Sequence, residues 1–565
     1  MVRGAVGLNC AFCLIFIVLS LICYFNTINS PFILDDDVLV VKNLYIKKLV
    51  LIPQLFKVNI FYFANQELSI GDLYYRPLQA LSYAFDYSFG KLNTYGYHLV
   101  NIFLHAFNSF ILFLLLGLIF KNKILVFLTS AIFCIHPIQG SVVAYITGRG
   151  SILEAFFILC SLFLATKYFL NGKLIQYLCS LLMFIFALLS REGAILLPFL
   201  VSLFSLFLPI DKKRIPRLIL PYLLIAGLYI LFRAFFMPCS KCTFSNFVSF
   251  TKIRDFIFLS QNYLSQLILP IGLRGLFFRD TLSIKVIFLI LAWLITGVSL
   301  AGAVIFKRKT FIFGLILYFL SLLPTINLID HISYYGVILC EHYLYLASIG
   351  IFFILASLII FLERKIGFFA KLLTVVLFLF YFSLTIINNN YYKDEITFYR
   401  HILSVNKDNR FVRINLGNAY FQEKMFNQAI NQAHMFLVGE PDAWEAYLLL
   451  GNAYFAKGQI DLAIEFFQKT IKFNPVGIQG YLNLGIAFAQ LDKVVQAEKV
   501  FNEALIKFPS SVKLRKNLGA LYGNMGDFKK AIFIWQGALL LDPQDQSLKD
   551  NISYANKLLT RGLLQ

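Results

Sequence analysis

Three consecutive carboxylates follow directly on an apolar run near the start of the chain. The stretch FILDDDVLVVKN, residues 32–43, places Asp35, Asp36 and Asp37 where the preceding segment should leave a membrane. Charged groups beside a bilayer are costly, so they commonly mark a functional site or a water-filled cavity. A carboxylate at such a place can act as a general base that takes a proton from a hydroxyl group. We therefore treat Asp35 and Asp36 as candidate catalytic residues.

Arginine residues stand in three polar segments between apolar runs. Arg76 lies in YYRPLQ, Arg149 in ITGRGS and Arg191 in SREG. A guanidinium group can hold a phosphate through two parallel hydrogen bonds, so these arginines are predicted to bind the phosphate of a donor substrate. For Arg191 the alternative is a simple ion pair with the adjacent Glu192.

A polar stripe runs along one predicted apolar helix. His98, Asn101, His105 and Asn108 are spaced at three, four and three residues and therefore share one helix face. Such a stripe in a membrane span faces either a cavity or polar partners on other helices, and the sequence leaves both open. Further polar residues gather near the same ends of the spans. The candidate cavity residues are His98, Asn101, His105, His136, Glu192, Glu341 and His342, and Glu154, Asp330 and His331 lie near them.

The elements that must position these residues are mostly membrane helices. Of the 565 residues, 59% are hydrophobic, 17% aromatic and only 14% charged, and the mean hydropathy is +0.74. Lys and Arg number 50 against 30 Asp and Glu, but residues 390–565 carry only 20 and 16 of these. The positive excess thus belongs to the apolar part of the chain, which argues for the loop bias of membrane proteins and against nucleic-acid binding.

About eleven apolar segments are long enough, or nearly long enough, to span a bilayer. The first lacks a small-residue cleavage site, so we expect an anchor that stays rather than a signal peptide. Most of the nine cysteines sit inside these segments, whereas Cys239 and Cys242 lie in a polar loop, where they either oxidise or remain two ordinary thiols. The predicted spans are 5–25, 96–120, 124–136, 151–170, 174–189, 193–209, 217–236, 283–305, 310–328, 343–362 and 367–388.

Alternate connections between these segments are basic. They include KNK at 121–123, DKKRIPR at 211–217 and KRK at 307–309, which the positive-inside rule assigns to the cytoplasm. The opposite connections, with the three aspartates and the candidate arginines, then face away from the cytoplasm. The positive-inside rule disfavours arginine in such connections. The presence of arginines there therefore favours a binding role for them.

After residue 390 the sequence becomes that of soluble helices with an internal repeat. Small, apolar and proline positions recur every 34 residues, which is typical of tetratricopeptide repeats (TPRs). The recurring positions are Leu416-Gly417, Leu450-Gly451, Leu484-Gly485 and Leu518-Gly519; Ala429, Ala463, Ala497 and Ala531; and Pro441, Pro475, Pro509 and Pro543.

The chain is therefore predicted to be all-helical, with a membrane bundle at 1–389 and a connector containing a partial repeat at 390–409. Four repeats at 410–544 and a capping helix with a tail at 545–565 complete it. With an odd number of spans, the repeats share a compartment with the aspartates. Their concave face is predicted to bind an extended peptide, and a spacer or oligomerisation surface is the alternative.

Seven segments carry a resemblance when taken in order. They are FILDDDVLVVKN, YYRPLQALSYAFDY, YHLVNIFLH, HPIQGSVVAYITGRGSILEAFF, SREGAILLP, EHYLYLASIG and the trailing repeats. Together they resemble the transmembrane and tetratricopeptide repeat-containing proteins and their bacterial relatives, of the GT-C glycosyltransferase superfamily, which are similar to protein O-mannosyltransferases. The resemblance implies a polyprenyl-phosphate sugar donor and an acidic catalytic pair, here Asp35 and Asp36. Two positions depart from the family pattern: Arg191 replaces a lysine, and His342 replaces an arginine.

The resulting hypothesis is a membrane glycosyltransferase that moves a sugar, mannose being the candidate, from a lipid phosphate to a Ser or Thr hydroxyl of a protein held by the repeats. Its active site would face the periplasm or exterior of a bacterial inner membrane. The sequence does not decide whether the loop carboxylates bind a divalent cation, because no ligand spacing requires one. The rival is a non-enzymatic membrane scaffold, which has no use for so many spans; a transporter would carry its charges near the midplane.

Overall fold

The structure, a computed structural model, describes residues 2–60, 74–236, 250–273, 276–278, 309–328, 337–405, 407 and 409–562. The chain forms two compact units, Met1–Lys407 and Asp408–Gln565. The predicted helical class is confirmed, because helices make up almost all described elements of both units. The residue pairs 239/242 and 330/331, which include the two loop cysteines, lie outside the described residues.

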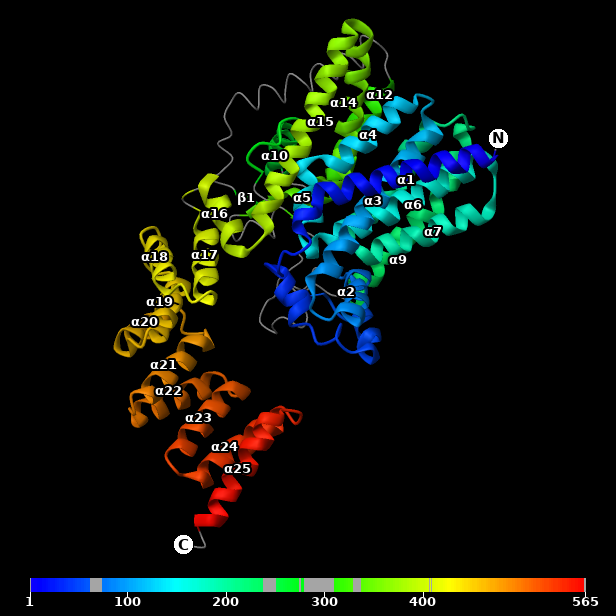
Figure 1. Cartoon of the computed structure of the whole chain (residues 1–565). Helices are drawn as coiled ribbons and strands as arrows, with labels where there is room; N and C mark the ends of the chain where they lie inside the picture. The colour runs from blue at the N-terminus through cyan, green and yellow to red at the C-terminus, as the bar shows by residue number, and fades with distance from the viewer. Residues whose placement is uncertain are drawn as a thin grey trace. The chain divides into compact units, whose positions relative to one another are not determined.

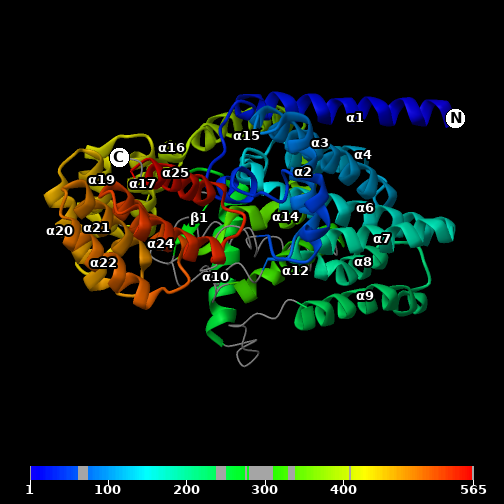
Figure 2. The same ribbon diagram turned by 90° about the horizontal axis from the view of Figure 1, so that it is seen from below.

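Apolar helices build the first unit, and α1, α3, α6 and α7 lie side by side in it (Figures 1 and 2). The helices are α1 (Val2–Tyr24), α3 (Thr94–Ile119), α4 (Lys123–Ile135), α5 (Gly140–Val143), α6 (Arg149–Asn171), α7 (Leu174–Ser190), α8 (Leu197–Leu206), α9 (Ile215–Phe236), α10 (Phe250–Ile268), α12 (Lys309–Leu322), α14 (Leu344–Ile366) and α15 (Phe368–Asn389). Short helical turns extend them: η1 (Phe25–Thr27), η5 (Pro137–Gln139), η6 (Ile146–Gly148), η7 (Glu192–Leu196), η8 (Lys212–Arg214), η11 (Leu323–Leu328), η13 (Glu341–Tyr343) and η14 (Asn390–Tyr392).

Short polar residues set several of these helix boundaries. The side chain of Asn93 accepts a hydrogen bond from the Tyr95 N–H at the start of α3, and Asn122 does the same for two N–H groups at the start of α4. Such caps satisfy N–H groups that have no partner within the helix. Gly172 ends α6 at a φ of 71°, a left-handed conformation that glycine adopts without strain.

Among the described residues, six helices are long and apolar enough to cross a membrane, and a bent pair is a seventh candidate. Three shorter apolar helices, Leu174–Ser190, Glu192–Leu206 and Lys309–Thr325, lie with them. Every predicted span except 283–305, which lies outside the described residues, coincides with one of these helices. The chain is therefore a multi-pass membrane protein. The helix α10 was not predicted, because it lies in a connection that was read as a loop.

The bent pair joins Lys123–Ile135 to Pro137–Val143 at an angle of 47°. Proline lacks the N–H group that would continue the helix, so the chain turns at this residue. His136, at the break, accepts a hydrogen bond from the Ile138 N–H through its Nδ1 atom. The break leads into residues 144–148, which face the aspartate segment.

A small layer with its own core lies beside the bundle. It contains the π-helical turn η2 (Asp37–Val41), η3 (Leu49–Phe56) and α2 (Pro77–Gly90), whose buried side chains include Val40, Leu55 and Tyr83. One departure from the all-helical prediction is a two-stranded antiparallel sheet of β1 (Leu276–Phe278) and β2 (Val337–Cys340). The helix α16 (Glu395–Val405) closes the first unit.

The second unit is a succession of helix pairs, which follow one another from α17 to α25 (Figure 1). Within three of the four repeats a glycine admits the ring of the second helix: a Cβ atom on Gly451 would lie 2.4 Å from Cε1 of Phe467. The helices are α17 (Arg410–Gln422), α18 (Phe426–Leu437), α19 (Trp444–Ala456), α20 (Ile460–Phe473), α21 (Ile478–Gln490), α22 (Val494–Lys507), α23 (Val512–Asn524), α24 (Phe528–Leu541) and α25 (Gln546–Gly562).

The close approach at Gly519 leads to a test of this packing. A Cβ atom there would lie 2.3 Å from Nε1 of Trp535, so Gly519→Ala should destabilise the pair of α23 and α24 by about 1–3 kcal/mol through overpacking. The measurement is hydrogen-exchange protection of amides in these two helices. Gly537→Ala is the matched control, because its Cβ atom would meet the nearest side-chain atom at 3.5 Å, an ordinary contact. Equal protection in both variants would contradict the packing argument.

Candidate functional site

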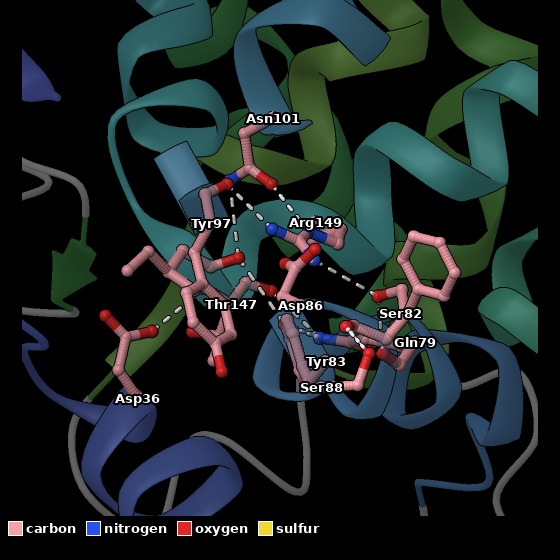
Figure 3. A network of polar contacts seen from close by, with 12 residues as sticks. Asp36, Gln79, Ser82, Tyr83, Asp86, Ser88, Tyr97, Asn101, Thr147 and Arg149 are labelled. Atoms are coloured by element: carbon pink, nitrogen blue, oxygen red, sulfur yellow. Dashed lines mark hydrogen bonds and ion pairs between the residues drawn. The ribbon is translucent and has the colours of Figure 1, made fainter. Parts of the chain in front are cut away.

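The buried carboxylate of Asp36 anchors the aspartate segment. Its Oδ2 atom accepts the Ile33 N–H at 3.0 Å. Its Oδ1 atom accepts the Thr147 N–H at 2.9 Å (Figure 3). The residue is fully buried. Because both oxygens are occupied by backbone donors, Asp36 joins the loop 33–37 to the turn η6 and is poorly placed to reach a substrate.

The neighbouring Asp35 is exposed. Its backbone N–H donates to the hydroxyl group of Tyr145 at 3.0 Å, and the adjacent Leu34 N–H donates to Glu395 at 2.8 Å. Surrounding protein raises the pKa of Asp35, while the Tyr145 hydroxyl and the positive charge of Arg76 act to lower it. Asp35 is thus an accessible carboxylate within the electrostatic reach of an arginine, whereas Asp37 forms a surface ion pair of 2.5 Å with Lys42.

Arg149 is fully buried in a polar network rather than open to a ligand (Figure 3). Its guanidinium pairs with Asp86 and donates to Asn101 Oδ1 at 2.7 Å and to the Tyr97 carbonyl at 2.7 Å. It also lies 5.1 Å from the ring centre of Tyr83. These contacts tie α6 to α2 and α3, so the geometry argues against the predicted phosphate contact at Arg149.

Arg76 and Arg191, by contrast, join a cluster that contains a third arginine, Arg233. We call Arg76, Arg191 and Arg233 the arginine cluster. Both Nε and Nη2 of Arg76 approach Glu192 Oε2, at 3.2 and 3.1 Å, and Nη1 of Arg233 lies 3.4 Å from Oε1. Arg191 lies 4.0 Å from Glu154 and 4.8 Å from the ring centre of Tyr343.

Arg191 thus pairs with Glu154, whereas Glu192 pairs with Arg76 and Arg233. The structure does not form the alternative ion pair between Arg191 and Glu192. The cluster brings three guanidinium groups to two glutamates, which leaves one excess positive charge. Arginine groups that are partly buried and held in fixed directions are suited to bind an anion such as phosphate. The side chain of Arg76 retains 14% exposure and that of Arg233 20%, so both are reachable.

Hydrogen bonds between helices occupy the polar stripe of α3. His98 contacts the Ser30 carbonyl at 3.0 Å, and Asn101 donates to the carbonyls of Tyr145 and Ile146. His105 lies 2.7 Å from the Tyr345 hydroxyl and 3.0 Å from the Cys134 carbonyl. Of the two alternatives that the sequence left open, these contacts favour interhelical bonding over a cavity lining.

The remaining predicted residues are His136, at the break after α4, and Glu341 and His342, in the turn η13. His136 packs between the rings of Phe352 and Tyr381, with centroid distances of 4.7 and 4.5 Å. Glu341 is buried beside a small pocket that His401 also lines. His342 is half-buried, with its ring 4.3 Å from that of Tyr343, and Arg191 and Arg76 act on it electrostatically. His342 therefore lies near the arginine cluster.

The sequence analysis did not identify two residues of the candidate site, Arg233 and Tyr145. Arg233 lies near the end of the apolar helix α9, and a charge inside such a helix is a recognised sign of function. Tyr145 carries no comparable signal, because a lone tyrosine in a turn is common. No group of three or more His, Cys, Asp or Glu side chains suited to a metal ion occurs among the described residues. Asp36 already uses both oxygens, so no reaction step is assigned to a cation.

Comparisons with known proteins bear on this arrangement. Two profiles described as tetratricopeptide repeat match residues 444–475 and 516–545. A Caenorhabditis elegans protein named protein O-mannosyl-transferase is 27% identical to this chain over 72% of its length and 59% of the relative's own. The resemblance to the transmembrane and tetratricopeptide repeat-containing family is confirmed.

Other relatives match over shorter stretches. Protein O-mannosyl-transferase Tmtc1 of Drosophila melanogaster is 26% identical over 35% of this chain and 23% of its own length. Protein O-mannosyl-transferase TMTC2 of Homo sapiens is 33% identical over 26% of this chain and 18% of its own. The chain thus spans 59% of the length of the Caenorhabditis elegans relative and about a fifth of the length of the other two.

Solved structures, TPR proteins among them, are similar to part of this chain. A thermophilic TPR protein of Thermus thermophilus covers 31% of this chain and 93% of its own, at 21% identity and a TM-score of 0.26. The protein MamA covers 27% and 89%, at 24% identity and a TM-score of 0.25.

The buried ion pair of Arg149 and Asp86 is expected to stabilise the folded state of the first unit. Asp86→Asn leaves the buried guanidinium without its counter-charge, which should lower the free energy of unfolding by about 3–5 kcal/mol. The measurement is thermal unfolding of the purified protein in detergent. The matched control is Lys42→Ala, which breaks an exposed pair with Asp37 and should cost at most about 1 kcal/mol. Similar losses in both variants would contradict the structural role of Arg149.

The pKa of Asp36 yields a second test. Burial raises this pKa to about 8, against the hydrogen bonds from Ile33 and Thr147, which lower it, and the charge of Asp35 adds to the rise. The unfolded chain loses this proton near pH 4, so between pH 4 and 8 the folded state binds more protons. Stability contributed by this proton is therefore lost as pH rises, by at most about 1.4 kcal/mol per pH unit.

The expected observation is a decline in the stability of the native protein from pH 5 to 8 that is flatter in Asp36→Asn. Denaturant titrations in detergent at several pH values measure it. Asp37→Asn is the control and should keep the native slope, because its ion pair lies at the surface. A slope that is the same in all three proteins would show that Asp36 does not carry the effect.

Proposed function

We propose that this chain is a membrane glycosyltransferase of the GT-C type that transfers a sugar, mannose in the first instance, to a protein hydroxyl. The donor in this proposal is a polyprenyl-phosphate sugar, and the reaction takes place on the non-cytoplasmic side. The observation that carries the proposal is that Asp35 is exposed and that the positive charge of Arg76 acts to lower the pKa of its carboxyl group. The names of the relatives support protein O-mannosylation as the reaction class.

The step assigned to Asp35 is proton removal from a Ser or Thr hydroxyl of the acceptor. The hydroxyl oxygen forms a bond to the anomeric carbon of the sugar, and the bond from that carbon to the phosphate oxygen breaks. The proton passes to Asp35, and the lipid phosphate leaves as an anion. Attack opposite the leaving group inverts the anomeric centre.

The arginine cluster would stabilise the leaving phosphate. Its guanidinium groups are already held in place by Glu192 and Glu154, so little reorganisation is needed when negative charge develops. Asp36 keeps a different role in this proposal. Because its oxygens hold the loop against η6, it sets the position of Asp35 and does not itself take the proton.

The repeats are proposed to present the acceptor polypeptide. Repeat arrays offer extended binding surfaces, and an odd number of membrane spans would place this array in the compartment of the aspartates. A bacterial inner membrane, with the site facing the periplasm or exterior, remains the proposed location. The alternative is a membrane-anchored scaffold without enzymatic activity, which the tetratricopeptide repeats by themselves would also suit.

Substitution of Asp35 separates the two functions. Asp35→Asn should lower the rate of sugar transfer by a factor of about 10²–10⁴, because it removes the general base, and should leave donor binding unchanged. The assay uses purified protein, a synthetic mannosyl-phosphate lipid and peptides that contain Ser and Thr. Asp37→Asn is the control and should retain activity.

Two results would contradict the enzyme proposal. One is an Asp35→Asn variant that supports the same protein glycosylation in cells as the native chain. The other is a carboxyl-terminal tag found in the cytoplasm, which would separate the repeats from the aspartate segment.

A further inference from the structure

The residue before the exposed Asp35 has an uncommon backbone conformation. Leu34 has a φ of 54°, in the left-handed region that residues with a side chain rarely occupy. Such a conformation persists where the surrounding structure holds it, and it is concentrated at functional sites. Because the two residues are adjacent, the conformation of Leu34 decides the direction in which the Asp35 carboxylate leaves the loop.

Glu395, the first residue of α16, contacts the backbone at Leu34. Its Oε1 atom accepts the Leu34 N–H at 2.8 Å, across 361 residues of sequence. A carboxylate is a strong acceptor for a backbone N–H. The next N–H group, that of Asp35, donates to the Tyr145 hydroxyl at 3.0 Å. Two side chains from distant segments thus hold two successive N–H groups of the loop.

The first turn of α16 is itself capped. The side chain of Asp394 accepts the Thr397 N–H at 2.7 Å and the Thr397 hydroxyl at 3.0 Å. Such a cap satisfies an N–H group that has no partner within the helix and fixes where the helix begins. The backbone of Glu395, which follows the capping residue directly, therefore has a defined position.

Asparagine side chains join the chain before α16 to the end of the first membrane helix. Asn389, the last residue of α15, donates to the Cys23 carbonyl at 2.9 Å and to Asn26 Oδ1 at 3.1 Å. Asn26 donates in turn to the Ile386 carbonyl at 2.9 Å and to Asn390 Oδ1 at 3.1 Å. The loop of the aspartates and the helix α16 thus both start from segments that are hydrogen-bonded to each other.

Tyr399 of α16 also lies near the two carboxyl groups. It stands one helical turn after Glu395 and is 7% exposed. Burial raises the pKa of its hydroxyl, and the negative charges of Glu395 and Asp35 raise it further. In the sequence, α16 leads to the first repeat helix α17, which begins at Arg410. The helix that contacts the aspartate loop is therefore part of the connector to the repeats.

We propose that Glu395 is a positioning residue for Asp35. By accepting the Leu34 N–H, it holds Leu34 in the left-handed conformation and so directs the Asp35 carboxylate toward the acceptor hydroxyl. Glu395 touches neither donor nor acceptor, and no proton passes to it. This inference rests on the proposed function of Asp35. It gives the connector between membrane helices and repeats a part in the transfer step.

Two substitutions of Glu395 separate its hydrogen bond from its charge. Glu395→Ala removes the acceptor and should lower kcat for sugar transfer about 10–100-fold at an unchanged KM for the donor, because a small displacement of a reacting group is costly. Glu395→Gln keeps an oxygen for the Leu34 N–H and should retain kcat within about threefold. Glu363→Ala is the matched control, because it removes a glutamate from an ion pair with Lys371, and it should leave kcat unchanged.

Substitution of Leu34 tests whether the backbone conformation transmits the effect. Glycine adopts a positive φ without the steric penalty of a Cβ atom. Leu34→Gly combined with Glu395→Ala should therefore regain at least about threefold of the lost kcat. Leu34→Ala combined with Glu395→Ala is the control, because it shortens the same side chain but keeps the Cβ atom, and it should regain nothing.

Hydrogen exchange measures the loop independently of catalysis. In the purified full-length protein in detergent, the amides of residues 33–37 should exchange at least about fivefold faster in Glu395→Ala than in the native chain, because the loop opens more often. Glu395→Gln and Glu363→Ala should exchange at the native rate.

The outcomes distinguish this inference from the proposed function. Unchanged exchange in Glu395→Ala, or unchanged kcat in that variant while Asp35→Asn abolishes transfer, would refute the positioning role and leave the proposed function intact. Equal losses of kcat in Glu395→Ala and Glu395→Gln would show that charge acts rather than the hydrogen bond, and would also refute it. A native chain that transfers no sugar would refute both together.

Discussion

The candidate site depends on one buried carboxylate with two backbone partners. Asp36 links the loop that follows the first membrane helix to the turn η6 at the start of α6, a segment 111 residues away in the sequence. The loop by itself has little regular structure to hold it. Without this link, the chain would have no fixed direction in which to present the adjacent Asp35, because a loop with few buried contacts opens easily.

The turn that receives Asp36 is itself held by a chain of polar contacts. Asn101 donates to the carbonyls of Tyr145 and Ile146, and its side-chain oxygen accepts from Arg149. Arg149 in turn pairs with Asp86 of α2. A buried network of this kind resists rearrangement, because each broken contact leaves another unpaired polar group in apolar surroundings. Arg149 thus supports the candidate site by holding the turn in place.

Helices pack through different interactions in the two units of the chain. In the bundle, polar side chains such as His105 and Asn108 form hydrogen bonds between helices. Such bonds contribute to helix association in a membrane, because lipid provides no hydrophobic driving force between spans. In the repeats, which are exposed to water, glycine positions admit aromatic rings and bury them. This second mode is modular, because three of the four repeats use the same pair of positions and each needs only its neighbours.

Much of the fold was predictable from the sequence, because it follows from patterns that are local or periodic. Hydropathy located the spans, and the 34-residue period located the repeats, since apolar length and repeat register are properties of neighbouring residues. Elements that were not predicted include α2 and α10, which lie in connections between the predicted spans, and the small sheet, which pairs strands about 60 residues apart. Pairing between distant segments leaves no local pattern in either segment.

For the site, the sequence by itself determined which residue types are present: three aspartates after the first span, and arginines between later ones. Only the tertiary structure decided their separate roles. It buried Asp36 and left Asp35 accessible, enclosed Arg149 and brought Arg233 to Glu192. The physical reason is that burial and ion pairing depend on which distant helices meet, and identical side chains acquire different chemistry from the partners that the fold gives them.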